Sequence, residues 1–146
     1  MKTLADILGA PHQREAVVAD LVKLVETQVE AARGLKGMTL RTGLGMLQKA
    51  RPDILPRAIG RYLPDFANAM EPLHRKFRAG ADRDFSVFLQ RHSADVAGAI
   101  LGLADERVAA STNTTVKTWY GRIRSAVDSE IRNAVPALSK LLRGYL

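Results

Sequence analysis

The chain has 146 residues, of which 47% are hydrophobic and 25% are charged, and it contains no cysteine. This length predicts one domain that can bury a core without a metal or a disulfide, and the cysteine count excludes disulfides, thiolate nucleophiles and sulfur-ligated metals. With 22 lysines and arginines against 15 acids, the formal charge of +7 points to an acidic partner and says nothing about fold.

The first third of the chain predicts three helices. Thr3 can cap a short helix over residues 3–8, which Gly9 would end. Pro11 suits the first position of a longer helix that reaches about residue 32, because valines and leucines recur there at helical spacing. A third helix is expected over residues 39–49, where Gly43 and Gly45 weaken the helix and so indicate close packing against a neighbour.

Prolines divide the middle of the chain. Pro52, Pro56, Pro64 and Pro72 follow one another at intervals that an uninterrupted helix does not favour, because an interior proline removes one backbone hydrogen bond. We therefore expect two short helices, over about residues 53–62 and 64–78, with the second kinked or restarted at Pro72.

Four more helical segments are expected after the turn at residues 80–83. Asp84 can cap a short helix, and Ser93 can cap the next one, over about residues 94–109. A polar loop at residues 111–114 precedes a long amphipathic helix, and Pro136 is expected to start a final one. Because no segment has the alternation of a strand, the predicted fold is all-α, a single-domain bundle of about seven helices with short loops.

The positive charge is concentrated in one block. Residues 33–61 contain seven bases and Asp53 as the only acid. The leading hypothesis is a non-enzymatic helical interaction protein whose basic face contacts an acidic partner, either nucleic acid or an acidic protein, with an anionic membrane surface as a weaker option. The partner could also be a second copy of the chain in a homodimer. The candidate polyanion-binding residues are Arg41, Lys49, Arg51, Arg57 and Arg61, with a second cluster of Arg75, Lys76 and Arg78.

This hypothesis requires basic side chains that point outward, lie adjacent and are not neutralised. The competing interpretation is that they form ordinary solvated helix faces, because a charged fraction of 25% is average for a globular domain. The acidic first long helix could also lie against the basic block and neutralise it.

A second hypothesis is a DNA-binding regulator with a degenerate helix-turn-helix at residues 103–124. The segments 103–106 and 115–119 resemble the two helices of bacterial DNA-binding domains, which would place Val116 and Trp119 inward. The chain departs from this pattern because Arg107 replaces a buried aliphatic residue, Val108 replaces the turn glycine, and the connection is two residues too long. The residues that would face DNA are Lys117, Thr118, Arg122 and Arg124.

A third hypothesis is a binder of a small apolar ligand, with Tyr62, His74 or Arg75 at the mouth of a pocket among the proline-rich helices. No catalytic motif is present, and the three histidines lack the spacing of a helical zinc site, so the sequence predicts no enzyme, no metal and no cofactor. With neither a secretory signal nor a long apolar run, a cytoplasmic location is expected.

Several stretches of the first half resemble a family of small all-helical bacterial proteins, mainly from actinobacteria and their relatives, to which no activity is assigned. The resemblance is carried by residues 3–6, 16–22, 51–58 and 63–67, which read TLAD, AVVADLV, RPDILPRA and LPDFA. It implies a bacterial cytoplasmic setting and one continuous domain, and it supplies no functional residues.

Overall fold

The computed structural model describes residues 2–146, and over this range the chain forms helices and no strand. This confirms the predicted all-α bundle of about seven helices. The helices are α1 (Leu4–Leu8), α2 (Arg14–Ala31), α3 (Gly34–Ala50), α4 (Ile54–Ala79), α5 (Phe85–Arg91), α6 (Ser93–Ala109) and α7 (Thr114–Arg143).

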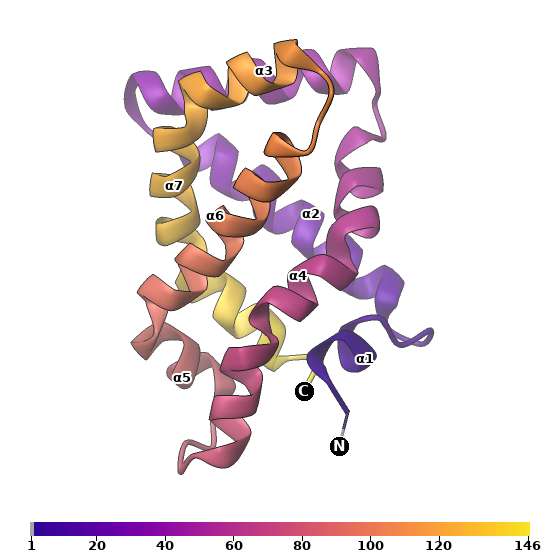
Figure 1. Cartoon of the computed structure of the whole chain (residues 1–146), viewed down its shortest axis with the longest axis vertical. Coiled ribbons are helices and arrows are strands. Elements are labelled where there is room, and N and C mark those ends of the chain that lie inside the picture. The colour runs from indigo at the N-terminus through magenta and orange to yellow at the C-terminus, as the bar shows by residue number, and fades with distance from the viewer. Residues whose placement is uncertain (1) are drawn as a thin grey trace.

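The helices are arranged around a long α2 that crosses the middle of the molecule (Figure 1). Helix α3 lies across one end, where the first turns of α7 pass alongside it, and α5 lies toward the other end. Helices α4 and α6 run in opposite directions in front of α2, and both chain termini lie near α1 (Figure 1).

Apolar side chains form two separate cores. The larger core joins α1, α2, α4, α5, α6 and α7 around fully buried residues such as Leu4, Met70 and Leu142. The smaller core lies between the end of α2, α3 and α7, and its buried members are Ala32, Leu40, Ile123 and Ala126. A row of half-buried apolar side chains lies between the two cores.

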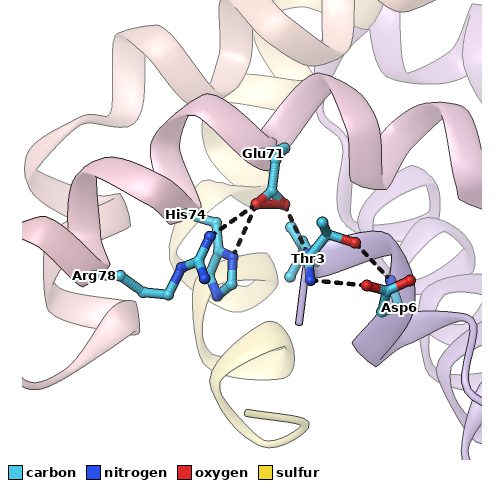
Figure 2. A network of polar contacts seen from close by, with 6 residues as sticks. Thr3, Asp6, Glu71, His74 and Arg78 are labelled. Carbon is cyan, nitrogen blue, oxygen red and sulfur yellow. Dashed lines mark hydrogen bonds and ion pairs between the residues drawn. The ribbon is translucent and has the colours of Figure 1, made fainter. Parts of the chain in front are cut away.

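Thr3 caps α1 as predicted, with a capping box between Thr3 and Asp6. Glu71 of α4 holds this helix start in place, because its carboxylate accepts a hydrogen bond of 2.7 Å from the backbone N–H of Leu4 (Figure 2). The same carboxylate accepts a bond of 3.2 Å from Arg78 and lies 3.5 Å from Nδ1 of the buried His74. Glu71 therefore fastens the start of α1 to α4.

The predicted helix break at Pro64 and the predicted helix start at Pro136 are wrong, and α4 does not restart at Pro72. Helix α4 continues through Pro64 and Pro72, and α7 continues through Pro136. An interior proline leaves one carbonyl, four residues earlier, without its helical partner. Burial of one face of α4, including Leu63 and Met70, outweighs that loss.

Three predicted helix starts are also displaced. Helix α3 begins at Gly34, five residues before the expected start. Helix α2 begins at Arg14, because residues 11–13 form a turn, and Pro11 is therefore outside it. Ser93 is the first residue of α6, with His92 in the cap position. The predicted cap by Asp84 is confirmed, since its carboxylate accepts bonds from the N–H groups of Ser86 and Val87.

The two glycines inside α3 differ. A Cβ atom on Gly43 would lie 2.3 Å from Cζ2 of Trp119, so this glycine permits close contact between α3 and α7. Gly45 has no neighbour within 4 Å of that position, and the expected close packing is absent there. None of the helices in residues 2–146 is long and apolar enough to cross a membrane.

Candidate functional site

The basic block over residues 33–61 is divided between the two ends of α3. Arg33 and Lys36 lie at the start of this helix, whereas Arg51 directly follows its end. A helix of 17 residues is about 25 Å long, so these groups do not form one local site. Lys49 is exposed in the last turn of α3 and therefore lies at the same end of this helix as Arg51.

Arg41 has a structural role at the end of α2. Its Nη1 donates hydrogen bonds to the backbone carbonyls of Ala32 and Glu30. The last carbonyls of a helix lack helical partners, and a cation there also interacts favourably with the helix dipole. The Arg41 guanidinium is therefore engaged within the fold.

Four arginines surround one concave site between the start of α2 and the first turns of α4. We call it the arginine hollow; its volume is about 540 Å³, and Arg14, Arg51, Arg57 and Arg61 are among the residues that line it. No acid is among the residues that line it. The remaining lining residues are Ile54, Pro56, Ala58, Gly60 and Tyr62.

Arg14 is held in this site by a backbone carbonyl that Pro64 leaves without a helical partner. Pro64 has no N–H for the carbonyl of Gly60, and Nη2 of Arg14 donates to that carbonyl at 2.9 Å. Sequence reasoning missed Arg14 because it belongs to the acidic first long helix. The Gly60–Pro64 spacing signals a carbonyl that needs a donor, but it does not identify the donor.

Acidic neighbours neutralise the hollow only weakly. Arg57 lies 3.8 Å from Asp53, and both side chains are more than 60% exposed, so this pair contributes little attraction in water. Within residues 2–146, no acid of α2 forms an ion pair with Arg14, Arg51 or Arg61. The neutralisation by the acidic helix that we considered from sequence is therefore not seen here.

Tyr62 forms one wall of the hollow and contacts two cations. The guanidinium carbons of Arg61 and Arg107 each lie 5.5 Å from the centre of its ring, within the range of cation–π attraction. Arg107 also pairs with Asp65 at 2.7 Å. This arrangement fixes Tyr62 between α4 and α6.

The second predicted basic cluster lies away from the hollow. Arg75 and Lys76 are exposed near the end of α4, and Arg75 is roughly 20 Å along the helix axis from Arg61. Arg78 is only 24% exposed and is bonded to Glu71. The structure therefore brings Arg51, Arg57 and Arg61 together and leaves the second cluster separate.

The proposed DNA-reading residues lie on the first turns of α7. Lys117, Thr118 and Arg122 are exposed, while Trp119 packs against Gly43 of α3. Val116 is 39% exposed, although a recognition helix would need it as an inward anchor.

Asp105 joins α6 to α7. Arg124 binds its carboxylate through two hydrogen bonds of 2.9 and 2.8 Å, and the Tyr120 hydroxyl donates a third of 2.8 Å. The bonds from Arg124 and then Tyr120 lower the pKa of Asp105 to about 2. Burial, followed by the bond to Asp105, raises the pKa of Tyr120 to about 12. The Arg124 side chain is thus engaged in the contact between α6 and α7.

An apolar groove lies beside the arginine hollow. Its volume is about 400 Å³, it is lined by residues of α2, α3, α4, α6 and α7, and Tyr62 lines both sites. His74 and Arg75 are not among its lining residues, so of the three residues predicted at the mouth of an apolar pocket only Tyr62 lies there. The other lining residues are Leu21, Leu24, Val25, Gln28, Val29, Leu40, Ile59, Leu63, Phe66, Ile100, Leu103, Val127, Glu130, Ile131, Ala134 and Leu138.

The histidines do not form a metal site in the part of the chain that is described. Residues 2–146 contain no group of three or more His, Asp or Glu side chains placed to hold a metal ion. His74 instead makes an edge-to-face contact with Phe85, and His92 lies 3.6 Å from Asp95.

Comparison with known proteins identifies the family of the chain. Residues 4–146 match the family of unknown function DUF6918, and the chain therefore belongs to this family. No curated protein and no solved structure matches the sequence.

Proposed function

We propose that this member of a family of unknown function is a non-enzymatic binding protein that holds a compact anionic group in the arginine hollow. The observation that carries the proposal is the presence of four arginines, and of no acid, among the residues that line one concave site. The partner is acidic, as the basic block suggests, but its contact with the protein is local.

The chemistry of arginine favours this role. A guanidinium is always charged and presents a planar set of donors that matches the oxygens of a phosphate or a carboxylate. Arg14 is already held by the Gly60 carbonyl, and Arg61 by the Tyr62 ring, so less side-chain freedom is lost on binding. The four like charges repel one another, and an anion between them relieves that repulsion.

The distribution of the remaining bases favours a compact anion over a long polyanion. Lys36 and Arg75 are separated from the hollow along α3 and α4, and Arg122 lies on α7. A nucleic acid that binds through many phosphates needs a continuous basic track. The arginine hollow offers one site with concentrated charge.

A pair of charge-matched triple variants tests the proposal. The hollow variant carries Arg51→Gln, Arg57→Gln and Arg61→Gln, and the control carries Arg75→Gln, Lys76→Gln and Arg122→Gln. Pyrophosphate binding is measured by calorimetry, and binding of a short labelled single-stranded DNA by fluorescence anisotropy, at about 50 and 200 mM salt. Circular dichroism verifies that both variants are folded.

We expect pyrophosphate to bind the wild type and the control with similar affinity. The hollow variant should bind it at least about 10-fold more weakly, because each guanidinium supplies a charged hydrogen bond that contributes on the order of 1 kcal/mol or more. Equal weakening of both variants, with tighter binding to DNA than to pyrophosphate, would instead indicate a diffuse polyanion surface. No binding to the wild type at either salt concentration would refute the proposal.

A further inference from the structure

The apolar groove interrupts the packing of apolar side chains in the middle of the bundle. It lies between the larger core and the smaller one, and its lining residues come from five helices, α2, α3, α4, α6 and α7. Large side chains in the middle of the fold, including Phe66, Ile100 and Ile131, are only half buried because they face this space. Side chains that face a space of this kind lack the neighbours that a packed interior supplies.

The chemistry of the groove is almost uniform. Apart from Tyr62 at one edge, Gln28 and Glu130 are the polar residues in its lining. They bond to each other at 2.8 Å, which satisfies one donor and one acceptor within the wall. The remaining wall can therefore contact an aliphatic chain and offers such a ligand few polar groups.

Charge is distributed unequally around the groove. Tyr62 belongs to both sites and carries Arg61 and Arg107 against its ring, so the arginine hollow adjoins the groove at this residue. The carboxylate of Glu130 belongs to the part of the groove wall that is formed by α7. An anionic group is attracted to the four arginines of the hollow, whereas the charge near Glu130 is mixed, because Arg33 and Lys36 line a second surface hollow together with Glu130.

We infer that the ligand is a single-chain anionic amphiphile, with its aliphatic chain in the apolar groove and its phosphate or carboxylate head in the arginine hollow. This inference rests on the proposed function and names the class of ligand. The groove volume of about 400 Å³ suits one chain and falls within the range of roughly 300–1,000 Å³ that is usual for small-ligand sites. The groove meets the arginine hollow at Tyr62, and the positive charge of the arginines there favours an anionic ligand over an uncharged one.

The experiment separates the contribution of the chain from that of the head. Inorganic phosphate, octyl phosphate, dodecyl phosphate and an uncharged dodecyl glycoside are titrated, below their micelle concentrations, into the wild type and the hollow variant. Two groove variants are included: Ala134→Phe, which fills the groove, and Leu103→Gln, which makes its wall polar. Leu35→Gln is the matched control, because Leu35 is 81% exposed and lies outside the groove.

In the wild type, affinity should rise by roughly 30- to 200-fold from octyl to dodecyl phosphate, because each buried methylene contributes up to about fourfold. Ala134→Phe and Leu103→Gln should flatten this dependence and leave inorganic phosphate binding unchanged, while Leu35→Gln changes neither. The hollow variant should weaken every phosphate and leave the glycoside unaffected.

The outcomes that overturn the inference differ from those that overturn the proposed function. If phosphates bind independently of chain length, the hollow holds the head alone and the inference is wrong. If the groove variants convert a dimer into a monomer in sedimentation experiments and dodecyl phosphate does not bind, the groove is covered by a second copy, and the inference is again wrong. If the glycoside binds as well as dodecyl phosphate and the hollow variant changes neither, the proposed role of the arginines fails.

Discussion

The contact between α3 and α7 makes a prediction in which one chemical change has opposite effects at two positions. Replacing glycine by alanine inside a helix stabilises a protein by about 0.8–1 kcal/mol, because glycine loses more backbone freedom on folding. Gly45→Ala should show this gain, since nothing lies within 4 Å of the added methyl group. For a chain of this size the melting temperature should rise by about 2–4 °C.

Gly43→Ala should destabilise the protein instead. The added Cβ would lie 2.3 Å from Cζ2 and 3.2 Å from Cε2 of Trp119, whereas carbon atoms pack at about 3.5–4.0 Å. The rigid indole ring must retreat by more than 1 Å, and such overpacking costs about 1–3 kcal/mol. After the helical gain is subtracted, we expect a net loss of up to about 2 kcal/mol.

Urea unfolding followed by tryptophan fluorescence measures both variants, because Trp119 is the only tryptophan in the chain. The Gly43→Ala variant should also show a shifted emission maximum in the folded state, while Gly45→Ala should retain that of the wild type. Equal stabilisation of both variants, with unchanged emission, would show that α3 does not contact Trp119 in the way described.

Three other predictions concern stability. Glu71→Gln should lower the free energy of unfolding by about 2–3 kcal/mol, because it removes the charged partner of the Leu4 N–H and of Arg78. Amide hydrogen exchange at residues 3–8 should become faster. An unchanged free energy in urea unfolding would contradict the anchoring role. Asp84→Ala should lower stability by about 1–2 kcal/mol through loss of the α5 cap, and thermal melting would show the argument wrong if the midpoint did not move. The pKa of Asp105 is about 2 in the folded protein against 3.8 for an ordinary aspartate, so its stabilising effect is present above pH 3.8 and is lost as the pH falls toward 2. The stability of the Asp105→Asn variant should therefore fall less between pH 3.8 and pH 2 than that of the wild type. A measured pKa near 3.8 for the Asp105 carboxyl group would disprove this prediction.

The fold class could be predicted from the sequence because local signals agree with the final structure. Thr3 and Asp84 cap helices as expected, and the spacing of apolar residues identifies the helical segments. The prolines misled the prediction because the loss of one hydrogen bond is local, whereas the packing that compensates for it is not. Pro64 shows this directly, since the carbonyl it frees is satisfied by Arg14, 46 residues away.

The candidate site was only partly visible in the sequence. Arg51, Arg57 and Arg61 lie close together in the chain, Arg51 just before α4 and the other two in its first turns, so their proximity could be expected from the sequence. Arg41 could not be distinguished from them, because its bonds to the end of α2 depend on the angle between two helices. The groove was likewise hidden, since half-buried and fully buried leucines have the same helical spacing.

The placement of an anionic amphiphile across the hollow and the groove can be measured most directly by methyl NMR with dodecyl phosphate. Ile59, Ile100 and Ile131 line the groove and Ile54 lines the arginine hollow, while Ile7 lies in α1 and lines neither. We predict intermolecular nuclear Overhauser effects from the chain to the three groove isoleucines, a shift at Ile54 and no change at Ile7. Shifts scattered over the surface, with no such effects at Ile59, Ile100 or Ile131, would contradict this account of the site.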